Sequence, residues 1–164
     1  MLHLRRAEVG DVNEILELIR ELAAYEREPQ AARATAADLL RDGFGTEPKF
    51  QVTMAEWGER VAGFALYFYN YSTWEGRPGL YLEDLFVREE FRGRGIGKGL
   101  LVHLAQVAVG AGCTRFQWQV LDWNQSALTF YESLGARVRR EWLPMLLEGA
   151  ALQRLATQTT GATQ

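Results

Sequence analysis

Cysteine and histidine are scarce in this chain. Its 164 residues include one cysteine, Cys113, and two histidines, His3 and His103. A single cysteine excludes an internal disulfide framework and a cysteine-based zinc site. Neither histidine has a sequence-level reason to lie beside Cys113. We therefore expect no metal site, and we expect Cys113 to be a small packed side chain rather than a nucleophile.

Long apolar runs and strong net charge are also missing. No stretch of about 18 apolar residues could span a bilayer, and the N-terminus has no apolar core of a signal peptide. The formal net charge is −3, so no basic field would recruit nucleic acid. We expect a soluble, cytoplasmic protein with no membrane or nucleic-acid partner. Its length fits one domain, residues 1–164.

Glycines are concentrated after an apolar, β-forming stretch at residues 80–87. There the chain reads Arg92, Gly93, Arg94, Gly95, Ile96, Gly97, Lys98, and a helical apolar pattern follows directly. Glycines allow successive backbone N–H groups to converge on an anion, and the helix N-terminus adds its positive end. The sequence therefore predicts a strand, a phosphate-binding loop and a helix.

The loop does not fit the two best-known phosphate motifs. The dinucleotide pattern G-x-G-x-x-G fails because Leu100 stands three residues after Gly97, and the P-loop fails because Gly99 follows Lys98. What remains is R-x-x-G-x-G, carried by Arg92, Gly95 and Gly97. This pattern resembles the pyrophosphate signature of the GNAT acyltransferase superfamily, whose members bind acetyl-CoA there. The alternative is an ordinary glycine-rich turn with solvated arginines.

Apolar spacing predicts the other elements. Before the loop we expect a strand at 2–6, a helix that begins at 11, ends around 25–28 and is closed by Pro29, a short helix capped by Thr35, and antiparallel strands at 50–57, 61–71 and 80–87. After it we expect a helix from 96 to 108, a parallel strand at 116–121, a helix capped by Asn124, and strands at 136–142 and 145–155. Asp11 would cap the first helix, with Glu14 in capping-box position.

This order, β-α-α-β-β-β-α-β-α-β-β, predicts an α+β fold with a mixed, mostly antiparallel sheet flanked by helices. Together with the loop after the fourth strand, it resembles the GNAT fold. In that fold the fourth and fifth strands splay apart, and the pantetheine arm of the cofactor lies between them.

A narrower resemblance rests on short segments spread over nearly the whole chain. They are Tyr25-Glu26, Asp42-Gly43-Phe44-Gly45, Tyr81-Leu82-Glu83-Asp84, Trp123-Asn124, Phe130-Tyr131 and Gly135-Ala136. In order and spacing they resemble the diamine N-acetyltransferase branch, the spermidine/spermine acetyltransferase-like proteins. The chain departs from that branch at residues 70–79 and 137–147, which puts the identity of the acceptor in doubt.

The resemblance assigns acetyl-CoA as acyl donor and implies its binding residues. The main chain of Leu85, Phe86 and Val87 would pair with the pantetheine arm, as an extended molecule can with an open strand edge. Arg92, Gly93, Arg94, Gly95, Ile96, Gly97 and Lys98 would hold the pyrophosphate. Asn124 and Ala127 would bind the cofactor near Tyr131, although Asn124 also has the pattern of a plain helix N-cap.

Tyr131 is the candidate acid. A phenol with a pKa of about 10 can protonate a thiolate whose conjugate thiol has a pKa of about 8.5. Spacing alone favours a core aromatic at this position, and it is the resemblance that favours catalysis. Glu83 is the candidate base, acting through water, as the resemblance implies. Its alternative is an exposed strand carboxylate. Since Glu83 and Asp84 should point to opposite faces of a strand, only one can serve a given site, and we choose Glu83.

The predicted function is transfer of acetyl to a primary amine of a small cationic acceptor, such as a polyamine, a diamine or a thialysine-like compound. Tyr25, Glu26, Glu83 and Glu141 would line an acidic acceptor pocket. We expect direct attack in a ternary complex, because no cysteine and histidine pair supports a covalent route, and a homodimer by resemblance. The alternatives are acetylation of a protein amine and a non-catalytic acyl-CoA-binding module.

Overall fold

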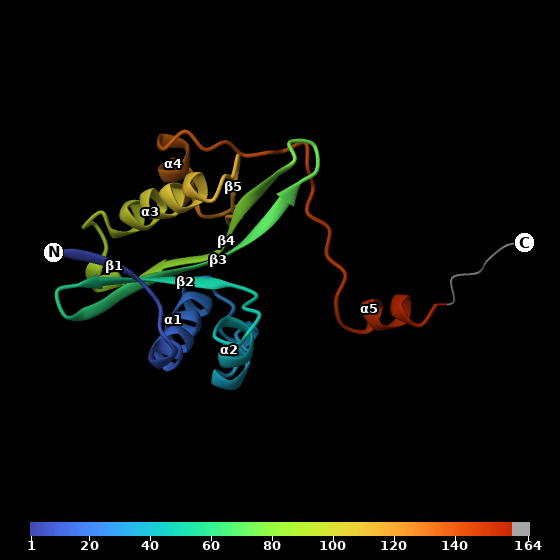
Figure 1. Ribbon diagram of the computed structural model, residues 1–164, viewed down its shortest axis with the longest axis horizontal. Coiled ribbons are helices and arrows are strands. Elements are labelled where there is room, and N and C mark those ends of the chain that lie inside the picture. Colours follow the sequence, from blue (N-terminus) through green and yellow to red (C-terminus); the bar gives the residue numbers. More distant parts are fainter. Residues whose placement is uncertain (159–164) are drawn as a thin grey trace, which may run out of the picture. The chain divides into compact units, whose positions relative to one another are not determined.

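The computed structural model describes residues 1–158 (Figure 1). The end of the predicted domain 1–164, residues 159–164, lies outside the described residues. The chain forms two compact units, Met1–Leu121 and a second that begins at Asp122. Within residues 1–158, no helix is long and apolar enough to cross a membrane.

The first unit is built on a five-stranded sheet with the order β1-β2-β3-β4-β5. The strands are β1 (Leu2–Arg6), β2 (Gln51–Trp57), β3 (Arg60–Ser72), β4 (Arg77–Val87) and β5 (Phe116–Gln117). β1 to β4 pair antiparallel, and β5 pairs parallel to β4. The α+β class, the mixed sheet and the direction of every predicted strand pairing are confirmed, although β5 is shorter than the predicted 116–121.

Helices cover both faces of this sheet (Figure 1). On one face lie α1 (Val12–Tyr25) and α2 (Ala36–Gly43), and on the other lies α3 (Ile96–Gly110). Short 3-10 turns are η1 (Val9–Asp11), η2 (Pro29–Ala31) and η3 (Glu89–Phe91). The core beneath α1 and α2 includes the fully buried Ile15, Leu18, Met54 and Phe64. The apolar stripe of α1 therefore fixes this helix against the strands that carry the site.

Of the two N-caps predicted in the first unit, the side-chain cap at Thr35 is confirmed. The Thr35 hydroxyl accepts from the Asp38 amide at 3.2 Å, and the Asp38 carboxylate accepts from the Thr35 amide at 2.9 Å, which is a capping box for α2. Asp11 is the N-cap residue of α1 as predicted, but its side chain makes no cap hydrogen bond. Its carboxylate instead accepts from the Arg5 guanidinium at 2.7 and 2.9 Å and from the Glu8 amide at 2.7 Å, so the arginine that pairs with Asp11 ties β1 to the turn before α1.

The second unit differs from the prediction at its C-terminal part. α4 (Gln125–Ser133) follows the predicted Asn124 cap, but residues 136–148 form no strand and Gly149–Ala156 forms α5. The two strands predicted at 136–142 and 145–155 are therefore wrong. In α5, Leu152 and Leu155 recur at helical spacing among good helix formers. The apolar content of this segment was misread as a strand signal.

Candidate active site

The edge of β4 opens next to β5. The two strands pair only at Leu80 with Phe116 and at Tyr81 with Gln117. Beyond this point β4 continues to Val87, paired on its other side with β3. Within the first unit, residues 82–87 have no strand partner on the edge away from β3. An extended molecule bearing amides can hydrogen-bond to such an edge, so the main chain near Leu85, Phe86 and Val87 can receive a pantetheine arm.

The loop after β4 leads into α3 with its N–H groups uncapped. Gly93 and Gly95 have φ values of 74° and 76°, in the left-handed region where a side chain adds strain. Gly95 is the N-cap of α3, and no side chain caps the helix. The first helical bond runs from the Gly99 amide to the Gly95 carbonyl at 2.9 Å. The amides of residues 96–98 precede it and are donors for an anion, so the loop fits a pyrophosphate.

The cationic side chains of this loop have different surroundings. Arg94 lies over the Trp57 ring, with its guanidinium carbon 5.4 Å from the ring centroid. Its guanidinium also donates to the Glu90 carbonyl at 3.4 Å. Lys98, in the first turn of α3, is exposed and is free to approach a bound anion. Main-chain N–H groups and Lys98 are therefore the groups of this loop that are available to an anion.

Arg92 turns away from that loop toward the end of α1. Its guanidinium carbon lies 4.6 Å from the centroid of the Tyr25 ring and 5.7 Å from that of Phe86. Its Nε donates to the Val87 carbonyl at 2.9 Å. The Tyr25 and Phe86 rings are themselves 6.4 Å apart. One arginine thus contacts both the strand end predicted to hold the cofactor and a residue predicted to bind the acceptor.

A β-bulge changes which carboxylate faces α1. Leu66 pairs with Asp84 and Tyr67 with Leu82, so Glu83 is an extra residue in β4. Leu66 belongs to the core beneath α1, and cross-strand partners share a face of the sheet. Asp84 therefore faces the side of α1, whereas Glu83 is exposed. The geometry favours Asp84 over Glu83 for a site on this side.

Two carboxyls of this region, those of Asp84 and Glu26, have raised pKa values. Burial, together with the charges of Glu83 and Glu26, raises the pKa of Asp84 to about 7. Loss of part of its hydration raises the pKa of Glu26. Tyr81 stacks on Phe68 with ring centroids 5.2 Å apart. A carboxyl that titrates near neutral pH suits proton transfer, and the acidic cluster beside an aromatic pair suits a cation.

The end of α1 brings Tyr25 and Glu26 to this cluster. The Glu28 amide bonds to the Ala23 carbonyl at 2.9 Å, and the Arg27 amide bonds to the Ala24 carbonyl at 3.1 Å. These are the two bonds of a Schellman motif, with Arg27 at φ 65° where glycine is usual. The chain thus stops α1 at a defined residue and holds Glu26 directly after it.

Arg88 anchors α1 to the end of β4. Its guanidinium forms ion pairs with Glu14 and Glu21 of α1, each at 2.8 Å, and donates to the Val61 carbonyl at 3.1 Å. Arg88 directly follows the cofactor-side strand, and both glutamates lie on the helix that ends at Tyr25. These ion pairs therefore fix the helix that carries the acceptor residues relative to the strand that carries Asp84.

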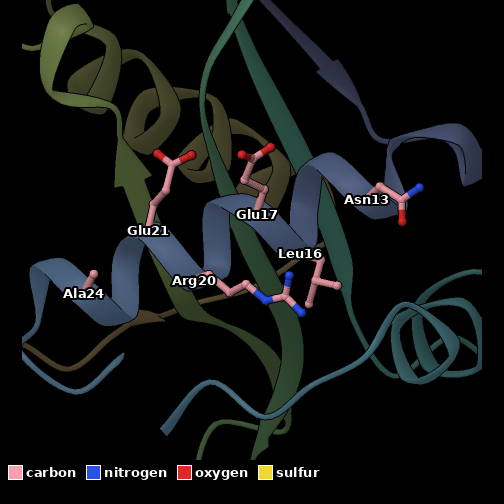
Figure 2. Close-up of a pocket in the computed structure, with 6 residues that line it drawn as sticks. All are labelled: Asn13, Leu16, Glu17, Arg20, Glu21 and Ala24. Carbon is pink, nitrogen blue, oxygen red and sulfur yellow. The ribbon is translucent and has the colours of Figure 1, made fainter. Parts of the chain in front are cut away.

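An open recess of about 540 Å³ lies along α1 and contains none of the predicted site residues. It is lined by Asn13, Leu16, Glu17, Arg20, Glu21 and Ala24 (Figure 2). Figure 2 shows Glu17 and Glu21 leaving the helix on the same side, and both form ion pairs with Arg88. This recess is a feature of the helix surface and plays no part in the site.

The second unit carries the remaining predicted residues. The Asn124 side chain accepts from the Ala127 amide at 3.3 Å, so the plain N-cap interpretation of Asn124 is confirmed. Tyr131 lies on α4, with its ring 5.5 Å from that of Phe130. Glu141 is exposed, and its own backbone N–H and two neighbouring arginines lower its pKa. Since these arginines neutralise it, Glu141 is a weaker candidate for binding a cation than Glu26.

Within the first unit the structure brings together Tyr25, Glu26, Glu83, Phe86 and Arg92. Sequence reasoning passed over Asp84 as the carboxylate on the side of α1, and it gave no role to Arg88. A bulge has no reliable sequence signal, so the face of Asp84 could not be read from alternation. The signal that was available is the pair of adjacent carboxylates inside an apolar strand, which is costly to bury without a purpose.

Comparison with known proteins agrees with this arrangement. Residues 12–136 match the Acetyltransferase (GNAT) family. The chain is 41% identical over 164 residues to the thialysine N-epsilon-acetyltransferase of Sus scrofa, covering 93% of this chain and 96% of that protein. It is 44% identical over 140 residues to the human spermidine/spermine N(1)-acetyltransferase-like protein 1, covering 81% of this chain and 20% of that protein.

The fold is shared with solved structures as well. An integron cassette protein from the mobile metagenome of V. cholerae superposes with a TM-score of 0.82 at 30% identity, covering 96% of this chain and 98% of that one. The match to the family spans both units, from α1 through α4. Members of this family use acetyl-CoA as acyl donor, which agrees with the open strand edge and the uncapped loop. The chain belongs to the Acetyltransferase (GNAT) family.

Proposed function

We propose that this enzyme transfers the acetyl group of acetyl-CoA to a primary amine of a small cationic acceptor. The observation that carries the proposal is Asp84, whose pKa of about 7 results from burial and the charges of Glu83 and Glu26. Such a cluster attracts an ammonium group and can accept its proton. The names of the relatives, which refer to thialysine and to spermidine/spermine, support a polyamine, diamine or thialysine-like acceptor.

The acceptor binds among carboxylates and aromatic rings. Tyr25, Glu26 and Glu83 contribute as the resemblance implies, and Asp84 joins them because the bulge turns it toward α1. Glu141, paired with arginines, contributes least. An ammonium ion with a pKa of about 10.4 is not nucleophilic, so it must lose a proton to this cluster before it can attack.

Asp84 takes that proton in place of Glu83, because its carboxyl faces α1 while Glu83 is exposed. The amine nitrogen then attacks the thioester directly in a ternary complex. A carbon–nitrogen bond forms, the carbon–sulfur bond breaks, and Tyr131 donates its phenolic proton to the departing thiolate. The attacking nitrogen loses its second proton to solvent, and a solvent proton restores the phenol. The products are an N-acetylated amine and free CoA.

The donor is held by main-chain groups. Leu85, Phe86 and Val87 pair with the pantetheine arm at the open edge of β4. The amides between Arg92 and Lys98 hold the pyrophosphate, and Lys98 supplies charge. Asn124 and Ala127, on the first turn of α4, bind the cofactor near Tyr131. The family match from 12 to 136 crosses the boundary between the two compact units, which supports one catalytic domain, residues 1–164.

The active form is a cytoplasmic homodimer, as the resemblance to the diamine branch implies, and an apolar segment in the second unit is consistent with a partner surface. Trp142, Leu143, Met145 and Leu146 are each more than half exposed. A run of such residues is unusual on the surface of a monomer. Sedimentation equilibrium of the intact chain tests this part of the proposal, and the mass of one chain at all concentrations would overturn it.

The reaction is tested by following acetyl-CoA-dependent thiol release with a panel of amines. The panel contains spermidine, spermine, a short diamine, thialysine, lysine and one lysine-bearing peptide. Turnover on a small amine is the expected result. Turnover on the peptide alone would move the function to protein modification. If no amine in the panel is turned over while calorimetry shows that acetyl-CoA still binds, the non-catalytic acyl-CoA-binding module would be favoured.

A further inference from the structure

Arg92 connects the two halves of the site within the first unit. Its Nε donates to the Val87 carbonyl at 2.9 Å, and its guanidinium covers the Tyr25 ring at 4.6 Å. Val87 ends the strand that takes the acyl donor, and Tyr25 ends the helix that carries the acceptor residues.

We propose that the Arg92 side chain is a positioning residue for the acceptor, acting through Tyr25, and that the loop binds phosphate through its main chain and Lys98. The inference rests on the proposed function, since it assigns Tyr25 and Glu26 to the acceptor side. A planar guanidinium can donate in its plane and stack on a ring with its face. A single residue can therefore fix the distance between the end of β4 and the end of α1.

Two features of the structure favour this role. Tyr25 is 42% exposed, and its ring contacts include the Arg92 guanidinium at 4.6 Å and the Phe86 ring at 6.4 Å. The end of α1 also contains a strained residue, Arg27 at φ 65°, which lowers the cost of local opening. The Tyr25–Phe86–Arg92 stack opposes that opening and keeps Glu26 beside Asp84.

A double-mutant cycle on kcat/KM for the amine tests the proposal. Arg92→Gln removes the charge, and Tyr25→Leu removes the ring. Each single change is expected to lower kcat/KM for the amine about tenfold, because small displacements near reacting groups are costly. The double variant is expected to lose about two- to fivefold less than the product of the two losses, the size of an exposed cation–π contact. Additive losses would overturn the coupling.

The individual constants separate positioning from phosphate binding. Arg92→Gln is expected to change kcat and KM for the amine while KM for acetyl-CoA stays within about twofold. Arg92→Lys, which keeps the charge but not the planar fork, is expected to recover part of the loss. A variant in which only KM for acetyl-CoA rises would return the Arg92 side chain to the phosphate site and overturn the proposal.

Arg60 offers a matched control. Its guanidinium carbon lies 4.8 Å from the centroid of the Phe91 ring and it pairs with Glu90 at 3.0 Å, outside the site. Arg60→Gln removes the same type of contact and is expected to leave all three kinetic constants unaltered. An equal effect from Arg60→Gln would show that the Arg92 effect is a general loss of structure and would overturn its specific role.

Amide hydrogen exchange needs no acceptor, so it tests the role of Arg92 even if the proposed function fails. If the unaltered enzyme acetylates no amine, the acceptor assignment fails, yet the coupling can still be measured. Arg92→Gln should speed exchange of the Glu26 and Glu28 amides, which bond to Leu22 and Ala23, by roughly two- to fivefold. Exchange identical to that of Arg60→Gln would overturn the link between Arg92 and the end of α1.

Discussion

Glu26 lies close enough to Asp84 that its charge, after burial and the charge of Glu83, helps to raise the pKa of the Asp84 carboxyl to about 7. The two residues are 58 positions apart, and each reaches the cluster by an irregularity. Asp84 follows a bulge in β4, and Glu26 follows a helix end built on a residue with positive φ. Two local deviations thus bring the two carboxyls together, and we propose that a cation binds there.

Replacing Asp84 by Asn should stabilise the folded protein at high pH. The native carboxyl has a pKa of about 7, whereas in the unfolded chain it is about 3.9. Between these values the native state binds more protons, so the free energy of unfolding falls as pH rises through this window. Removing the charge should raise that free energy by roughly 1–3 kcal/mol at pH 8 and by little near pH 4. Urea denaturation at both pH values measures this.

Glu83→Gln is the control for that experiment. Glu83 is exposed, so its replacement should change the free energy of unfolding by about 0.5 kcal/mol or less. The same stabilisation from Asp84→Asn at pH 4 and pH 8 would show that the titration of Asp84 is not its source.

The pH dependence of kcat/KM should identify the base. Asp84→Asn is expected to lower kcat/KM roughly 10²- to 10⁴-fold and to remove the rise in activity near pH 7. Glu83→Gln should move that rise to lower pH, because the Glu83 charge is one of the causes that raise the Asp84 pKa. If Glu83 is itself the base, the same variant will instead need a higher pH for activity. The direction of the shift decides between the two carboxylates.

The sequence predicted the sheet well because its strands and turns are encoded locally. Alternation and turn residues placed β2, β3 and β4, and the alternating glycines predicted a loop whose backbone is strained for other residues. The site was harder, because it depends on register. A bulge moves one carboxylate to the other face of the sheet without any local signal. Alternation said only that Glu83 and Asp84 face opposite sides, and Glu83 was chosen by resemblance.

Other misses have similar physical causes. The carboxylate of Asp11 was assigned to the following helix, but the tertiary contact with Arg5 engages it instead. Arg27 follows α1 in a conformation that usually needs glycine. The sequence therefore indicated no exact end for the helix and showed only that it ends before Pro29. The apolar residues of α5 form a segment too short to distinguish a strand from a helix by periodicity. Each error arises where a long-range contact or a backbone exception overrides local preference.

Replacing either loop glycine that has positive φ by alanine should be destabilising. Gly93→Ala and Gly95→Ala force a side chain into positive φ and should lower the free energy of unfolding by about 1 kcal/mol. They should also weaken acetyl-CoA binding by about tenfold, the cost of one misdirected hydrogen bond to a charged group. Calorimetric titration with acetyl-CoA and urea denaturation measure the two effects.

Gly110 is the matched control for the loop. At Gly93, Gly95 and Gly110 alike, an added Cβ meets no atom within 4 Å, so the three positions differ in backbone conformation rather than in space. Gly110 is the last residue of α3 and lacks positive φ. Gly110→Ala should therefore raise the free energy of unfolding slightly, by up to about 1 kcal/mol, and leave acetyl-CoA affinity unchanged. Equal weakening at all three positions would argue against a phosphate-binding loop.

Tyr131→Phe should separate the chemistry of the leaving thiolate from the packing of α4. The substitution removes only the phenolic oxygen, so the ring keeps its place beside Phe130. If the phenol protonates the thiolate, kcat should fall roughly 10²- to 10⁴-fold, while the affinity for acetyl-CoA and the thermal midpoint of unfolding stay close to those of the unaltered enzyme. Stopped-flow thiol release, calorimetry and circular dichroism measure the three quantities.

Tyr71→Phe removes the same group from a 60% exposed tyrosine of β3 and should leave kcat unaltered. The alternative is that Tyr131 only packs on α4, in which case Tyr131→Phe should leave turnover unaltered and lower stability. A Tyr131→Phe variant that turns over at the normal rate but unfolds at a lower temperature would assign its phenol to the stability of the second unit. The proton for the thiolate would then have to come from solvent, which would make kcat depend on buffer concentration in the unaltered enzyme too.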